Sequence, residues 1–99
     1  MPRFVATIRF TEQGIKNIGE TTRRAAAFKA AAKKLGAKVL DVYWSLGPFD
    51  GLLLFEAPDV ETATAAMLHL GAQGNVKTQT AQLFTAGEVE SILKSLGSR

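Results

Sequence analysis

The stretch Gly47-Pro48-Phe49-Asp50-Gly51 lies between two strand-forming runs, residues 37–46 and 52–56. Glycine favours turn conformations with positive φ and proline fixes its own φ, so the stretch predicts a tight turn. One helical pattern precedes the first run and another follows the second. The turn therefore marks the midpoint of a chain built from two similar halves.

The first half opens with residues 3–10, where apolar and mixed side chains alternate. A period of two predicts a strand with unlike faces. Residues 11–19 are interpreted as a connecting turn, because Gly14 and Gly19 disfavour a long helix. Thr11 is a possible N-cap for this turn.

Residues 20–35 repeat apolar side chains at helical spacing, which predicts a helix that ends at Gly36 in a left-handed cap. The stripe expected to face the core is Ala25, Phe28, Ala32 and Leu35. Residues 37–46 predict a second strand. Its alternation assigns side chains to two faces, Val39 and Tyr43 on one and Leu40, Val42 and Trp44 on the other.

In the second half, residues 51–56 are almost continuously apolar, which predicts a strand in the middle of the sheet. Asp59 is expected to cap a second helix. Its buried stripe is expected to be Val60, Ala63, Met67 and Leu70.

Residues 75–84 are more polar and predict an edge strand. Thr85 and Glu88 have the spacing of a capping box, which predicts a C-terminal helix covering part of the core or a neighbour. Its apolar stripe is Val89, Ile92, Leu93 and Leu96.

This order of elements predicts one α+β domain over residues 1–99 with the split βαβ plan. Its four-stranded antiparallel sheet would carry both main helices on one face. The candidates for the other, open face are Val5, Val39, Tyr43, Leu53 and Phe55, and the alternation does not decide between this set and the opposite one. Because a monomer would expose a large apolar surface, two sheets are expected to stack into a homodimer or higher oligomer. Leu53→Asp is expected to prevent that association.

Composition excludes several classes of function. The chain contains no cysteine, so disulfides, thiolate metal sites and a cysteine nucleophile are absent. Its longest apolar runs, such as residues 52–55, are too short to span a bilayer, and the N-terminus lacks a signal-peptide pattern. These features predict a cytoplasmic protein that has no membrane partner.

Half of the twelve basic residues fall in one segment: Arg23, Arg24, Lys29, Lys33, Lys34 and Lys38. Both a phosphate-binding surface and a solvated helix face fit such a cluster. The signature of RNA-binding sheets, in which glycines and aromatic residues follow a basic residue, is missing from residues 51–55. No nucleic-acid partner is therefore predicted.

Two side chains are candidates for proton transfer. Asp50 could act as a general base if burial raised its pKa, or it could accept backbone hydrogen bonds that hold the turn. His69 is the only histidine and could shuttle protons, or it could be an exposed residue near a helix end. At helical spacing its neighbours are Ala65 and Gln73, so no metal site is predicted.

Five residues could line a ligand pocket between the sheet and the helices or at a dimer seam: Arg9, Tyr43, Trp44, Lys77 and Gln79. They would supply an anion partner and an aromatic wall. Phe49, beside Asp50, is a further candidate ligand contact. The alternative is that these side chains serve packing and the solubility of an edge strand.

Three segments carry a resemblance: Thr11-Glu12-Gln13-Gly14-Ile15 after the first strand, the central Gly47-Pro48-Phe49-Asp50, and Val76-Lys77-Thr78-Gln79-Thr80. With them the chain resembles the GYD domain family over nearly its whole length. The family tyrosine that precedes the aspartate is Phe49 here, so a role that needs a phenolic hydroxyl is absent at this position.

The resemblance implies a ferredoxin-like fold with a four-stranded antiparallel sheet and an extra C-terminal helix, assembled as a dimeric α/β barrel. The family has no established reaction, and no cofactor is implied. The first hypothesis is therefore a small homo-oligomeric protein that binds a small molecule. The second is a cofactor-free isomerase or monooxygenase for a small aromatic or polyketide-like substrate, with Asp50 or His69 transferring protons and Arg9 holding an enolate. The third is a ligand-sensing module, and whether the chain is an enzyme stays open.

Overall fold

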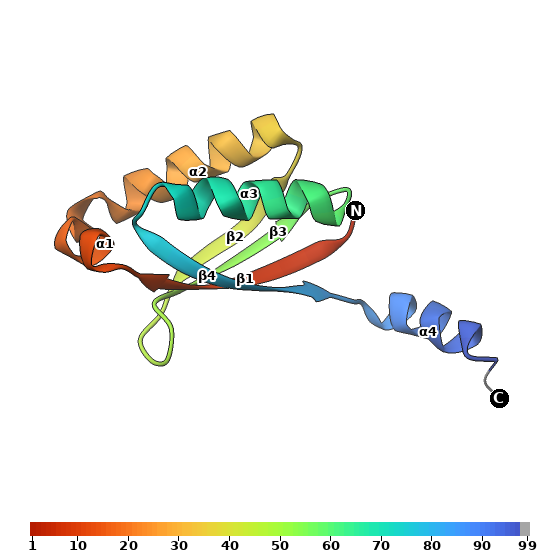
Figure 1. Cartoon of the computed structure of the whole chain (residues 1–99). Coiled ribbons are helices and arrows are strands. Elements are labelled where there is room, and N and C mark those ends of the chain that lie inside the picture. The colour runs from red at the N-terminus through yellow and green to blue at the C-terminus, as the bar shows by residue number, and fades with distance from the viewer. Residues whose placement is uncertain (98–99) are drawn as a thin grey trace.

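The computed structural model describes residues 1–97 and has the expected α+β architecture (Figure 1). Its elements in chain order are β1 (Arg3–Phe10), α1 (Glu12–Lys16), the 3-10 helix η1 (Ile18–Glu20), α2 (Thr21–Leu35), β2 (Lys38–Trp44), β3 (Gly51–Glu56), α3 (Val60–Ala72), β4 (Val76–Leu83) and α4 (Ala86–Ser95). The four strands form one antiparallel sheet in the order β2-β3-β1-β4. The central position of β3 and the edge position of β4 are thus confirmed.

Helices α2 and α3 lie side by side on one face of the sheet (Figure 1). The core between them and the sheet is built from Phe4, Ala6, Phe28, Ala32, Ala37, Val39, Leu53, Phe55, Ala57, Ala63 and Ala66. The rings of Phe4 and Phe55 stack across β1 and β3 with centroids 5.2 Å apart. Alanines on the inner helix faces allow the helices to lie close to these large sheet residues.

The predicted caps are confirmed. Gly36 has φ 98° at the end of α2, a value that favours glycine, and Asp59 accepts the Thr62 backbone N–H at 2.7 Å. Thr11 also caps as expected, but residues 12–16 form the helix α1 rather than a turn. Gly14 is tolerated there because it is buried against the Asn75 backbone at the start of β4 and has no side chain to accommodate.

Of the five candidates for the open face, three lie on the helix-covered face instead. Val39, Leu53 and Phe55 are buried beneath the helices, and Leu53 is only 2% exposed. Leu53→Asp would therefore disrupt the core and does not probe the open face. Only Val5 and Tyr43 lie on the open face, where Val5 pairs with Leu54 and Tyr43 with Leu52.

The error in β2 has a definite cause. The register shifts between Val39 and Asp41, which makes Leu40 the extra residue of a β-bulge. Val42 and Trp44 then share the inward face with Val39, because they pair with the inward positions Leu53 and Gly51. The period-two pattern had grouped Val39 with Tyr43.

Two helix stripes are narrower than expected. Leu35 is 42% exposed at the end of α2, and Val60 is 60% exposed at the start of α3. Of the remaining stripe residues, Phe28, Ala32 and Ala63 are buried in the core, and Met67 and Leu70 are half-buried and pack against it. Ala25 is half-buried. Both failures occur at helix ends, where the sheet gives less cover.

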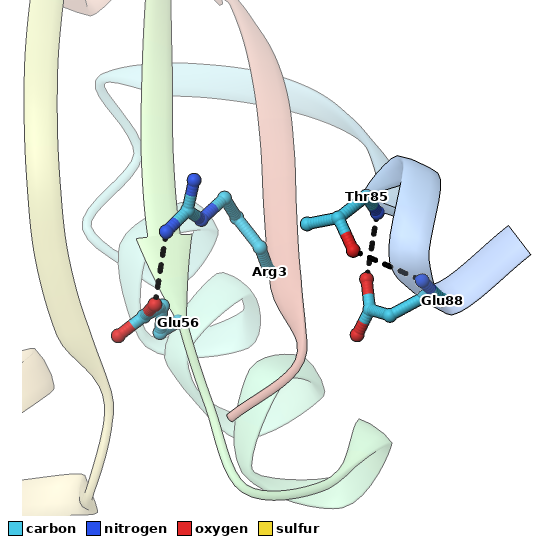
Figure 2. A network of polar contacts seen from close by, with 4 residues as sticks. All are labelled: Arg3, Glu56, Thr85 and Glu88. Atoms are coloured by element: carbon cyan, nitrogen blue, oxygen red, sulfur yellow. Dashed lines mark hydrogen bonds and ion pairs between the residues drawn. The ribbon is translucent and has the colours of Figure 1, made fainter. Parts of the chain in front are cut away.

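Beyond β4 the chain continues into α4, which points away from the body (Figure 1). The capping box is confirmed: the Thr85 backbone N–H donates to Glu88 Oε1 at 2.7 Å, and the Glu88 N–H donates to Thr85 Oγ1 at 3.1 Å (Figure 2). Within residues 1–97 the helix buries no residue against its own chain. The radius of gyration, 15.3 Å, exceeds the roughly 13 Å expected for a compact chain of this length because of this arm.

Candidate functional site

A cavity of about 330 Å³ opens between the sheet and helices α2 and α3, beside the central turn. It lies on the helix-covered face, where β1, the inward side of β2 and the beginning of β3 meet. Its volume is at the lower end of the range for small-molecule sites. Apolar side chains form most of its wall, including Ile8, Phe10, Phe28, Val42, Leu53 and Leu70.

One end of the cavity is aromatic. Trp44 points toward α2, where its Nε1–H donates to Thr21 Oγ1 at 2.9 Å. This bond orients the indole beside the cavity instead of leaving it free in solvent. Tyr43 also borders the cavity, although its register places it with Leu52 on the opposite face of the sheet. Tyr43 and Trp44 were both expected to form an aromatic wall of the pocket. Trp44 supplies most of that wall.

Asp50 lies at the border of the cavity and is half-buried. Its Oδ2 accepts the Phe10 backbone N–H at 2.8 Å, and its own N–H donates to the Ile8 carbonyl at 2.7 Å. These two bonds continue the hydrogen bonding between β1 and β3 by one residue, with the Asp50 carboxylate acting in place of a backbone carbonyl. Asp50 thus accepts a backbone hydrogen bond, as its structural interpretation predicted, but the donor belongs to β1 and not to the turn itself.

Arg24 supplies a positive charge to the same cavity. Its guanidinium donates to the carbonyl oxygens of Asn17 at 3.0 Å and Gly14 at 3.2 Å, which fixes its position from the side of α1. A guanidinium has five N–H donors, so these two bonds leave donors for a ligand. His69, in the last turn of α3, adds an exposed imidazole at the rim.

Of the eight residues predicted for a site, the structure brings four together at this cavity: Tyr43, Trp44, Asp50 and His69. Arg9 faces Lys77, and Gln79 faces Thr7, in the β1–β4 pairing. These positions belong to the open face of the sheet, as the alternation with buried Phe4 and Ala6 requires. Phe49 is half-buried in the turn, where its carbonyl accepts the Ser45 hydroxyl at 2.6 Å.

Sequence reasoning missed Arg24, Thr21, Gln73 and Asn75, all of which border the cavity. For Arg24 a signal existed, because it precedes the buried Phe28 by one helical turn and so shares its face. Treating Arg24 as part of a basic surface concealed this spacing. Gln73 and Asn75 lie in the link between α3 and β4, and only the folded chain brings that link to the cavity.

Two features are absent from residues 1–97. Across residues 1–97 there is no group of three or more His, Cys, Asp or Glu side chains arranged to hold a metal ion. In the same part of the chain, no helix has both the length and the apolar character needed to cross a membrane.

The fold and cavity define a class: an α+β protein with a ferredoxin-like sheet, whose helices and sheet enclose a small, largely apolar site. The sequence matches the GYD domain over residues 4–93. The chain belongs to the GYD domain family.

Two matches come from Thermus thermophilus. One, named glutamine synthetase and cystathionine beta-lyase binding protein, is 30% identical over 95 residues, which cover 95% of this chain and all of that protein. The other is the crystal structure of TTHA0845, with a TM-score of 0.57 and 25% identity, covering 87% of this chain and 96% of that one. The fold is thus shared with a solved structure over most of the chain.

Proposed function

We propose that this chain is a homo-oligomeric binding protein whose cavity takes a small organic ligand. The observation that carries the proposal is the 330 Å³ cavity, with a mostly apolar wall and the side chains of Arg24, Asp50 and His69 at its border. Ligand sites combine this kind of apolar lining with a few polar groups that fix orientation. A flat, mostly apolar molecule with a polar or anionic end fits this arrangement, because Arg24 offers donors and Trp44 an aromatic surface.

Native mass spectrometry of protein purified from its own cells tests the proposal. The expected result is a retained small molecule, visible as added mass on the intact protein. Ala25→Phe fills the cavity wall from α2 and should abolish the added mass. Ala26→Phe, on the exposed side of the same helix, is the matched control and should retain it. A molecule held equally by both variants would place the binding elsewhere.

An enzyme of the cofactor-free isomerase or monooxygenase kind is the second proposal. It is favoured by one observation, that Asp50 and His69 border the same cavity. Arg24, rather than the predicted Arg9 on the open face, would then stabilise an enolate. If this proposal holds, Asp50→Asn and His69→Gln should each lower the turnover of an aromatic or polyketide-like substrate while the ligand is still bound. Turnover that survives in both variants would exclude proton transfer by either group.

The proposed oligomer forms by stacking of two open sheet faces. That face carries an apolar centre, Val5, Leu52, Leu54, Ala81 and Leu83, between the two sheet edges. An ion pair from Arg3 to Glu56, 3.3 Å long, borders this centre (Figure 2). Leu54→Lys should reduce the mass measured by light scattering, whereas Lys38→Ala at the outer edge should leave it unchanged. An unchanged mass for Leu54→Lys would exclude stacking through this face.

We also propose a protein partner. The similar protein from Thermus thermophilus is named for binding glutamine synthetase and cystathionine beta-lyase, and its whole length is matched here. We propose that this chain binds the corresponding enzymes of its own organism in the cytoplasm, to which a cysteine-free sequence is suited.

Surface plasmon resonance against each purified enzyme tests this partner proposal. If the cavity makes the chain a ligand-sensing module, the affinity should change when the retained small molecule is added back. Binding that is the same with and without that molecule would separate the two functions, and absence of binding to both enzymes would overturn the partner proposal.

A further inference from the structure

Helix α4 is built to persist as a helix, although it buries no residue within the described part of its own chain. The residue before its N-cap is Phe84, which together with Val89 occupies the two positions of a hydrophobic staple. The capping box satisfies the first turn (Figure 2). A helix of ten residues is nevertheless marginal in water without tertiary contacts. To be stable, the helix therefore needs contact with another surface that covers its apolar side chains.

The side chains that need cover form one stripe. Val89, Ile92, Leu93 and Leu96 follow the i, i+3, i+4, i+7 spacing and are 41%, 46%, 44% and 70% exposed. Glu88 and Glu90 flank this stripe on either side of the helix. The stripe is thus an apolar face bordered by negative charge.

A groove of matching character lies between α3 and β4, on the helix side of the sheet edge. Its floor and walls include Val60, Met67 and Leu68 from α3 and Val76, Thr78 and Thr80 from β4. Val60 and Leu68 are 60% and 69% exposed, so apolar surface is open to solvent along its length. The volume of the groove is about 800 Å³, and among residues 1–97 Lys77 is the only charged residue that borders it.

The length of α4 matches the length of this groove. A ten-residue helix is about 15 Å long, and α3, with 13 residues, offers about 20 Å of groove. Lys77 borders the groove at the sheet edge, but its pairing with Arg9 places its side chain on the open face, so the fit depends on length and on the apolar character of both surfaces. The chain's own α4 lies past the end of β4 and away from the helix layer, so it does not reach its own groove (Figure 1).

We infer that α4 of one copy of this chain docks in the α3–β4 groove of a second copy. Each copy carries one uncovered helix and one open groove, so reciprocal exchange between two copies fills both and closes the assembly. The contact is an amphipathic helix in an apolar groove, anchored by residues one turn apart. It uses a surface different from the open sheet face, and either contact can form without the other.

Disulfide trapping between two full-length variants tests this exchange. Since the chain has no cysteine, each variant carries a single thiol. A chain with Ile92→Cys on α4 is mixed with an isotope-labelled chain with Leu68→Cys in the groove, under mild oxidation. The expected product is a mixed disulfide with twice the 10.6 kDa mass of one chain, identified by intact mass. Lys29→Cys on the exposed side of α2 is the control and should give little mixed product.

Three outcomes would overturn the inference. A mixed disulfide with Leu54→Cys in place of Leu68→Cys would show that α4 covers the partner's open sheet face. Disulfides formed mainly between two Ile92→Cys chains would show helix-to-helix pairing. Absence of mixed product, or as much of it with Lys29→Cys as with Leu68→Cys, would show that no specific exchange occurs.

Sedimentation equilibrium gives a second measurement. Replacing both Ile92 and Leu93 with Asp should weaken association about tenfold or more, because two apolar side chains lose their cover. Ser91→Asp, on the polar side of the same helix, is the matched control and should change association little. Unchanged association in the double variant would also overturn the exchange. Loss of association in Leu54→Lys alone, with the double variant unaffected, would assign association to the stacked sheets and count against the exchange.

Discussion

Replacement of Gly14 by alanine tests the contact that joins α1 to the start of β4. A Cβ built on Gly14 would lie 2.0 Å from the Asn75 carbonyl oxygen and 2.9 Å from the carbonyl carbon. Since carbon and oxygen do not approach much closer than about 3 Å, α1 must move from β4 by on the order of 1 Å. That oxygen accepts the Thr11 backbone N–H at 3.0 Å, and Thr11 Oγ1 donates to the Gly74 carbonyl at 2.6 Å. The movement therefore strains two hydrogen bonds as well as the packing.

The magnitude follows from these contacts. Overpacking typically costs about 1–3 kcal/mol, and each weakened hydrogen bond costs about 1 kcal/mol. The higher helix propensity of alanine returns about 1 kcal/mol. Gly14→Ala should thus lower the free energy of unfolding by about 2–4 kcal/mol.

Urea unfolding at fixed protein concentration measures the effect, with the fluorescence of Trp44, the only tryptophan, as the signal. With a denaturant slope of about 2 kcal/mol per molar, the midpoint should fall by about 1–2 M. Gly19→Ala is the control, because its Cβ would meet nothing within 4 Å, and it should shift the midpoint little. A Gly14→Ala midpoint equal to or above that of the unchanged protein would refute the steric argument.

Three further predictions concern Asp50, the core and one helix cap. Asp50→Asn should lower the free energy of unfolding by about 1 kcal/mol, because a neutral amide accepts the Phe10 N–H less strongly than a carboxylate does. The variant should still retain the ligand. Unchanged stability together with loss of the ligand in native mass spectrometry would contradict this. Phe55→Ala, at a position 1% exposed, should cost about 3–5 kcal/mol in urea unfolding, and a cost below about 1 kcal/mol would contradict the core assignment. Hydrogen bonds from Thr62 lower the pKa of Asp59 in the folded protein from its ordinary value of 3.8. The cap therefore stabilises the fold fully at pH values above 3.8, and this contribution is lost as the pH falls through the lowered pKa of the folded protein. Asp59→Asn should remove this part of the acid dependence of thermal unfolding, and an unchanged acid slope would count against it.

The sequence predicted the order of elements because its local signals agree with the fold. Gly36 caps the end of α2 and Asp59 caps the start of α3, as their residue types predict. The polar sequence of β4 was correctly interpreted as an edge strand. It could not predict which way β3 faces. Every residue from Leu52 to Phe55 is apolar, so alternation carries no information there, and only the placement of the helices buries Leu53 rather than Leu54.

The candidate site was predicted in part for a similar reason. Trp44 and Asp50 adjoin the central turn, so their proximity is local and predictable. Arg9 was assigned to the pocket by residue type, but the pairing of β1 with β4 places it opposite Lys77 on the open face. Arg24 reaches the cavity because α1 positions its guanidinium, and the short helix itself was not predicted.

The β-bulge at Leu40 divides β2 into two stretches whose inward positions follow different alternations. Before it, Val39 faces the core, and after it Val42 and Trp44 do so. Deleting Leu40 would leave Val39, Asp41 and Val42 in regular alternation opposite Phe55, Leu54 and Leu53, so the same side chains would face inward and only the bulge would be lost. The bulge thus accommodates one extra residue in β2 while Val42 and Trp44 keep their inward positions beside the cavity.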